Sequence, residues 1–128
     1  MIGYVTLGTD DLDRARAFYD ALFATIGATR VMQLDEQHGF TMYGRSLKEP
    51  GVVVMKPYDG QAMHPGNGNM VALAMSSKEK VDALHAKALE LGGTDEGAPG
   101  YRQTGNYFAY FRDLDGHKFA VFNLSREQ

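Results

Sequence analysis

Apolar and polar positions along the chain follow one order that occurs twice. Tyr4 to Gly27 and Met70 to Gly93 each predict a short apolar strand, a polar cap, an amphipathic helix and a terminal glycine. The two segments align without a gap at a constant offset of 66 residues, the separation of Tyr4 and Met70. Because unrelated segments rarely share these elements in the same phase, the pattern predicts a duplicated module. Identical residues fall at Val5/Val71, Leu7/Leu73, Ala17/Ala83 and Gly27/Gly93.

Each copy predicts a strand, a helix and three further strands. In the first copy the strands are expected at 2–8, 29–34, 39–44 and 51–57, with a helix from about Leu12 to Ile26. In the second copy strands are expected at 69–75, 94–98, 106–112 and 117–124, with a helix over 77–91 and a loop from Gly97 to Gly105. Asp10 is the expected N-cap of the first helix, and Ser76 with Glu79 the expected capping box of the second.

These elements predict an α+β fold of two tandem βαβββ modules whose sheets form a cup, with the helices outside. The modules are expected at 1–58 and 69–128, joined by a Gly- and Pro-rich loop over 59–68. With 128 residues the chain is expected to form one domain, 1–128.

Composition excludes several classes of function. A net charge of −3 without a basic stripe gives nucleic-acid binding no electrostatic support. The absence of cysteine excludes disulfides, thiolate nucleophiles and cysteine-ligated metals. The first residues show neither a signal peptide nor a membrane span, so the expectation is a cytoplasmic protein without a membrane partner.

Three segments resemble one known family. YVTLGTDDLDRARAFYDALFATIG resembles the opening motif of the vicinal oxygen chelate superfamily, which holds glyoxalase I, bleomycin-resistance proteins, fosfomycin-resistance enzymes and extradiol dioxygenases. KVDALHAKALELGGTDEGAPGYR is similar to the middle of small bacterial glyoxalase-like members, and NYFAYFRDLDGHKFAVF resembles the closing hairpin. The resemblance covers nearly the whole chain and implies the same cup-shaped fold.

The resemblance also implies a metal held by four side chains, histidine or glutamate, one from each of four strands. The matching positions in this chain are Tyr4 and Ala120, and the offset of 66 adds their repeat mates Met70 and Val54. A shift of one residue would offer Asn69 or Val53 instead. Divalent metals of this kind prefer imidazole nitrogen and carboxylate oxygen. We therefore expect no metal cofactor unless the ligands have been relocated.

Alternation along the strands extends the list of side chains that face the cup. It adds Thr6, Val52, Ala72 and Phe122, and turns Val5, Leu7, Val71 and Leu73 toward the helices. Tyr107 and Arg102 are further candidates to contact a ligand, by ring stacking and by pairing with a carboxylate. The alternative is that all cup-facing residues only fill the core.

Other candidate groups have a simpler structural interpretation. His38, His64, His85 and His117 lack ligand spacing and are expected to be solvated or hydrogen-bonded on the surface, with His64 the one most able to approach the cup. Tyr43, Tyr101 and Arg45 could reach a ligand, but strand packing or solvation explains them equally well.

Two functions of different classes follow. The first is a metal-independent protein, likened to the bleomycin-resistance branch, that binds a small apolar or aromatic molecule in the cup. The alternative is a glyoxalase-like lyase or a dioxygenase with relocated metal ligands or metal-free acid–base catalysis, drawing on Tyr4, His64, Tyr107 and Arg102. A purely structural or partner-binding module has little support, and relatives suggest a homodimer.

Overall fold

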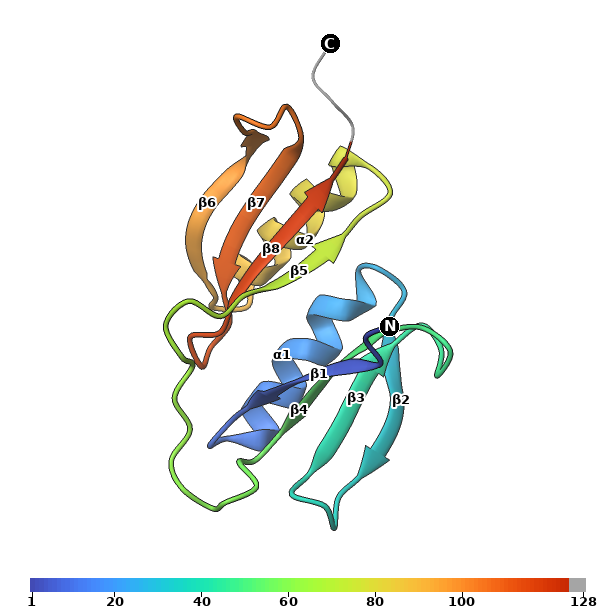
Figure 1. The fold of residues 1–128 in the computed structure, drawn as a ribbon, viewed down its shortest axis with the longest axis vertical. Coiled ribbons are helices and arrows are strands. Elements are labelled where there is room, and N and C mark those ends of the chain that lie inside the picture. Colours follow the sequence, from blue (N-terminus) through green and yellow to red (C-terminus); the bar gives the residue numbers. More distant parts are fainter. Residues whose placement is uncertain (125–128) are drawn as a thin grey trace. The chain divides into compact units, whose positions relative to one another are not determined.

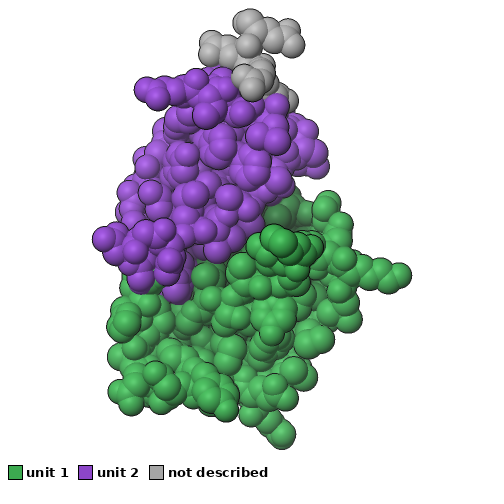
Figure 2. All heavy atoms as spheres, viewed as in Figure 1, with its two compact units in different colours: residues 1–65 green, residues 66–128 purple. Residues whose placement is uncertain are grey.

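The computed structural model describes residues 1–124 and contains two compact units, one from Met1 to Pro65 and one from Gly66 onward. Figure 2 colours the two units. Each unit contains one helix and one four-stranded sheet (Figure 1). The predicted α+β class, with two tandem βαβββ modules, is confirmed.

In the first unit the sheet has the order β1-β4-β3-β2. Strand β1 pairs with β4 in parallel, and the other pairs are antiparallel. Its elements are β1 (Tyr4–Gly8), α1 (Leu12–Ala24), β2 (Thr29–Leu34), β3 (Phe40–Gly44) and β4 (Gly51–Met55).

The second unit repeats this topology with the order β5-β8-β7-β6, again with one parallel pair, β5 with β8. Helices α1 and α2 both have 13 residues, and their bounds differ by the same 66 positions as the sequence repeat. Its elements are β5 (Val71–Ala74), α2 (Lys78–Glu90), β6 (Thr94–Tyr101), β7 (Tyr107–Arg112) and β8 (Lys118–Asn123).

Helix α1 begins at Leu12 as predicted and α2 begins at Lys78, one residue later than predicted, while both N-caps lie one residue after the predicted ones. Asp11, not Asp10, is the N-cap of α1, and its carboxylate accepts from the backbone N–H of Arg14. Ser77, not Ser76, caps α2 in the same way. Asp11 and Ser77 are repeat mates, as are Asp10 and Ser76, so the two copies are capped at equivalent positions. Asp10 instead accepts from the backbone N–H of Met63 in the linker.

The helices pack against their sheets through apolar stripes. Ala15, Phe18, Tyr19 and Leu22 are buried in α1, and Val81, Leu84 and Ala88 in α2. Each helix lies against one face of its own sheet (Figure 1). Within residues 1–124 neither helix is long and apolar enough to cross a membrane.

The loop expected from Gly97 to Gly105 is partly a strand. Strand β6 continues to Tyr101, paired with Tyr107, with register shifts on both sides of Gly97. Irregular pairing of this kind lets an edge strand contain glycine and proline, since the extra residues bulge out of the ladder. The strand therefore carries Arg102 to the end of the sheet instead of leaving it in a long loop.

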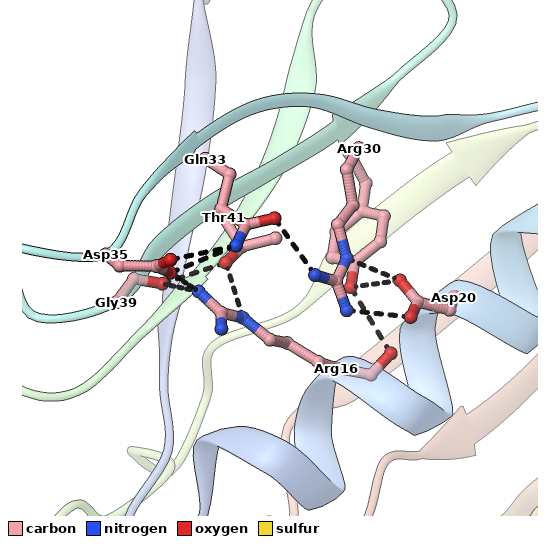
Figure 3. Close-up of polar contacts among 8 residues, drawn as sticks. Arg16, Asp20, Arg30, Gln33, Asp35, Gly39 and Thr41 are labelled. Carbon is pink, nitrogen blue, oxygen red and sulfur yellow. Dashed lines mark hydrogen bonds and ion pairs between the residues drawn. The ribbon is translucent and has the colours of Figure 1, made fainter.

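A polar network joins α1 to its sheet (Figure 3). Arg16 donates from Nε to the hydroxyl of Thr41 at 2.8 Å and from Nη2 to the carboxylate of Asp35 at 2.6 Å. Arg30 on β2 meets the carboxylate of Asp20 with two hydrogen bonds of 2.9 and 2.8 Å. These groups lie on the helix side of the sheet, so their role is to hold α1 in place.

Candidate functional site

Each sheet has one face covered by its own helix and one face that its helix does not cover, here called the uncovered face. On the first sheet, Tyr43 marks the covered face because its hydroxyl donates to Asp20 of α1 at 2.8 Å. Val52 pairs with Tyr43 and also with Val5, so Val52 lies on the covered face too. Tyr43 therefore contacts the helix and is not a ligand candidate.

This pairing corrects the sequence assignment of two residues. The prediction that Val52 and Val54 share a face with Tyr4 and Thr6 is wrong, because Val54 pairs with Leu7 on the covered face. Thr6 pairs with Val53, which belongs to the uncovered face. Tyr4 and Thr6 are exposed on that face, and the Tyr4 ring contacts the ring of Phe40 edge-on at 5.7 Å.

The error arises because the offset of 66 does not hold to the end of each module. Val5 pairs with Val52, whereas its repeat mate Val71 pairs with Phe119. The last strands are therefore related by 67 residues, and the equivalent of Ala120 is Val53. The second copy contains one more residue between its helix and its last strand, where β6 carries its bulges.

On the second sheet, alternation assigns the faces correctly. Phe111 packs against His85 of α2 and pairs with Phe119, which defines the covered face. Ala72 pairs with Ala120 on the opposite face. Phe122 shares this uncovered face, and Met70, 47% exposed, directly precedes β5.

Tyr107 is on the covered face, contrary to the prediction that it faces the ligand. Its hydroxyl donates to the Asp82 carboxylate of α2 at 2.6 Å, and this hydrogen bond raises the pKa of Tyr107 to about 12. Tyr101 pairs with Tyr107 and accepts from the ammonium of Lys78 at 2.6 Å. Both tyrosines therefore join the sheet to α2 and do not reach the uncovered face.

Three aromatic side chains stand together on the uncovered face of the second sheet. Phe108 stacks on Phe122 with ring centroids 5.1 Å apart and on Tyr110 at 5.9 Å, with interplanar angles of 14° and 13°. All three are half-buried. We call Phe122, Phe108 and Tyr110 the aromatic row. Sequence analysis missed Phe108 and Tyr110, although the pairing of β7 with β8 puts them beside Phe122 and Ala120.

Small residues flank the aromatic row. Ala72 and Ala120 lie on one side of Tyr110, and Gly97 of β6 lies on the other. A Cβ at Gly97 would come within 2.9 Å of the Tyr110 ring and 3.2 Å of Nη2 of Arg102, so any side chain here would crowd both groups. The Tyr110 ring therefore has alanine and glycine directly beside it on the other strands of the sheet.

Two cations accompany Tyr110. The guanidinium carbon of Arg102 and the ammonium of Lys118 each lie 5.5 Å from the centroid of the Tyr110 ring. Arg102 also donates to the carbonyl oxygens of Gly100 at 2.9 Å and Ala98 at 2.8 Å, which fixes its guanidinium along β6. Arg102, a residue predicted to reach a ligand, thus lies beside the uncovered face, whereas Tyr107 does not.

The four histidines lie in different places. His85 is buried in α2 with Nε2 3.1 Å from the Asp95 carboxylate, and His117 is buried in the closing hairpin turn. The His38 ring lies 5.0 Å from the Tyr58 ring, and His64 is exposed in the linker. The burial of His85 and His117 contradicts the expectation that all four histidines lie on the surface, and it favours structural roles for these two.

The residues at the family's ligand positions do not fit a divalent metal. With the corrected register these positions carry the phenol of Tyr4, the alkyl groups of Val53 and Ala120, and the thioether of Met70. None is the imidazole or carboxylate that such ions prefer. In the described part of the chain, no group of three or more histidine, aspartate or glutamate side chains lies together as a metal site would require.

The fold defines a protein of paired βαβββ modules, and comparison with known proteins identifies its family. A family model described as Glyoxalase/Bleomycin resistance protein/Dioxygenase superfamily matches residues 1–121. The chain belongs to this superfamily.

Solved structures agree with this assignment. A glyoxalase/bleomycin resistance protein from Albidiferax ferrireducens is 33% identical, with a TM-score of 0.84 over 96% of this chain and 98% of that one. A hypothetical protein from S. aureus is 26% identical, with a TM-score of 0.73 over 96% and 92%. A glyoxalase I mutant from Zea mays, 21% identical with a TM-score of 0.75 over 98% of this chain and 46% of that one, shares the fold. Curated proteins gave no match.

Proposed function

We propose that this protein binds a small aromatic or apolar molecule on the uncovered face of its second sheet, without a divalent metal. The observation that carries the proposal is the aromatic row of Phe122, Phe108 and Tyr110, half-buried and flanked by alanine and glycine. Small-molecule sites are ordinarily concave and mostly apolar with a few polar groups, and this face matches them in its composition.

The size of the expected affinity follows from the area that such a ligand can bury. Covering about 200 Å² of apolar surface contributes about 5 kcal/mol, and aromatic contacts add about 1 kcal/mol each. Loss of translational and rotational freedom opposes this gain. We therefore expect dissociation constants of roughly micromolar to millimolar for simple aromatic probes.

Family membership does not decide between binding and catalysis, because the family description names a glyoxalase, a bleomycin resistance protein and a dioxygenase together. The side chains at the metal positions favour binding, since they supply neither imidazole nor carboxylate. A lyase or dioxygenase reaction would need donors from elsewhere, and the described residues bring together no such group.

Binding can be followed by the fluorescence of naphthalene-based probes, because the chain has no tryptophan to interfere. Phe108→Leu deletes the central ring of the row while keeping an apolar side chain of similar size. We expect it to weaken probe binding by fivefold or more, roughly the loss of one stacked ring. Tyr58→Leu is the matched control, because Tyr58 is 83% exposed outside the sheets and should not affect binding.

Thermal unfolding tests the proposal that binding needs no divalent metal. The melting temperature is measured with nickel, cobalt, manganese, zinc or iron(II), each with and without chelator. Ligands that bind the native state raise its melting temperature by linkage. A clear, chelator-sensitive shift from one ion, or probe binding that requires it, would favour the lyase or dioxygenase alternative. Equal probe affinity in wild type and Phe108→Leu would reject the aromatic row as the binding surface.

We also propose a cytoplasmic homodimer as the working form. Exposed apolar side chains on the uncovered face of the first sheet support self-association, among them Tyr4, Met32 and Leu34. A second copy could bury such a patch. Sedimentation velocity at micromolar concentrations would show a species of twice the 14.1 kDa chain mass, and a monomer would reject this part.

A further inference from the structure

We infer that the molecule bound on this face is an aromatic anion, a planar ring system that carries a carboxylate. The inference rests on the proposed function, since it uses the same aromatic row, and it adds the charge of the ligand. Its basis is the pair of cations beside one ring, Arg102 and Lys118, each 5.5 Å from the centroid of Tyr110.

The Arg102 guanidinium is held where a ligand on the row would meet it. Two of its N–H groups donate to the carbonyl oxygens of Gly100 and Ala98, which fixes its position. A guanidinium has five N–H donors, so donors are left for an anion. Gly97 and Gly100 make the space, because a Cβ at either position would come within 3.2 or 3.3 Å of a guanidinium nitrogen.

Lys118 carries the second positive charge and lies on β8, which pairs with β7, the strand of Tyr110. It pairs with Arg112 across β8 and β7, two residues before Ala120 on the same face. Arg112 forms an ion pair with the carboxylate of Glu96 and also donates to the carbonyl oxygen of Gly116. Within residues 1–124, neither Lys118 nor Arg102 has a carboxylate partner, so the positive charge beside Tyr110 is not neutralised by a side chain.

These charges select among ligands that fit the row equally well. A carboxylate at the edge of a stacked ring would accept charge-assisted hydrogen bonds, which are stronger than neutral ones. A neutral amide of the same shape keeps the stacking and loses the ionic attraction. A cationic amine would be repelled by both groups. We therefore expect the affinity order carboxylate, then amide, then amine.

The test compares 2-naphthoate, 2-naphthamide and 2-naphthylmethylammonium with the wild-type protein in low salt. We expect 2-naphthoate to bind about tenfold more tightly than 2-naphthamide, the scale of one charge-assisted hydrogen bond. Added salt should reduce this preference, because part of the attraction is screened at the surface.

Lys118→Met removes one charge and keeps a long apolar side chain. It should weaken 2-naphthoate binding by about fivefold and leave 2-naphthamide binding unchanged. Lys80→Met is the matched control, because Lys80 is exposed on α2, and it should change neither affinity. Lys118→Arg should retain the preference for the carboxylate.

The outcomes separate this inference from the proposed function. Equal affinities for 2-naphthoate and 2-naphthamide, each weakened by Phe108→Leu, would overturn the anion preference and keep the aromatic site. An unchanged preference in Lys118→Met would remove Lys118 from the site and reject the two-cation geometry. Failure of all three probes to bind would overturn both proposals.

Discussion

Gly97→Ala is the change that most directly tests the geometry of the candidate site. The added Cβ would lie 2.9 Å from Cδ2 of Tyr110 and 3.2 Å from Nη2 of Arg102. Contacts below 3.0 Å essentially never occur for real Cβ atoms, so the Tyr110 ring must turn or the strand must shift. The contact with Arg102 is less severe and is relieved by a shift of a few tenths of an ångström, which loosens the hydrogen bonds from Arg102 to Gly100 and Ala98.

Two opposing terms set the size of the effect. Overpacking of this kind costs about 1–3 kcal/mol, and a single contact slightly below 3.0 Å places the cost at the lower end. Replacing glycine by alanine lowers the entropy of the unfolded chain and returns about 0.4–1 kcal/mol. The net expectation is a loss of about 0.5–1.5 kcal/mol in the free energy of unfolding.

Binding should suffer more than stability, because the shift displaces Tyr110 and Arg102 together. Urea denaturation gives the stability change, and fluorescence titration with 2-naphthoate gives the change in affinity. Gly3→Ala is the control, since a Cβ there meets no atom within 4 Å. If Gly97→Ala left both stability and affinity at wild-type values, the arrangement of Gly97, Tyr110 and Arg102 described above would be wrong.

Two further predictions concern the covered face of the first sheet. Tyr43→Phe removes the hydroxyl that donates to Asp20 at 2.8 Å and leaves the ring buried, so urea denaturation should show a loss of about 1–2 kcal/mol, and an unchanged midpoint would contradict it. Burial raises the pKa of Asp20, but hydrogen bonds from Arg30 and Tyr43 outweigh it and hold the pKa below its ordinary 3.8. The resulting stabilisation is present above pH 3.8 and lost as the pH falls through the lower folded-state pKa. Wild type should therefore lose more stability than Asp20→Asn between pH 5 and pH 2, and parallel losses would reject the assignment.

Much of the fold follows from local pattern. The stripe of Ala15, Phe18, Tyr19 and Leu22 and the glycine after each helix are properties of contiguous sequence, and the helices begin and end within two residues of expectation. The strands of each module follow from short apolar runs between turn residues. The duplication adds a constraint, because both copies must satisfy the same topology.

The register of distant strands does not follow from local pattern. GVVVM contains three consecutive valines that are all buried, so hydrophobicity does not mark which one faces α1. Only the pairing with β1 shows that Val53 stands beside Thr6. A shift of one residue exchanges the two faces of a strand, and this explains why Val52 and Val54 were assigned to the wrong one.

The positions of Tyr107 and Arg102 both depend on contacts that local sequence does not show. An aromatic side chain on a strand looks the same in sequence whether it contacts a helix or a ligand. Tyr107 faces α2 because Asp82 lies within 2.6 Å of its hydroxyl, a contact between residues 25 positions apart. Arg102 follows β6, a strand that continues through glycines because its register shifts. From sequence, the same glycines and proline predict a loop.

The corrected repeat also shows how the proposed site differs between the two modules. With an offset of 67 for the last strands, Lys118 corresponds to Gly51 and Phe122 to Met55. With the offset of 68 that pairing gives for β3 and β7, Tyr110 corresponds to Met42. The first module therefore keeps the sheet and, in Phe40, the equivalent of Phe108, but it has methionines in place of the other two rings and glycine in place of Lys118. Among the described residues, the three stacked rings with two cations beside them occur on the second sheet, which favours a role of this combination in ligand binding over a role in the fold that both modules share.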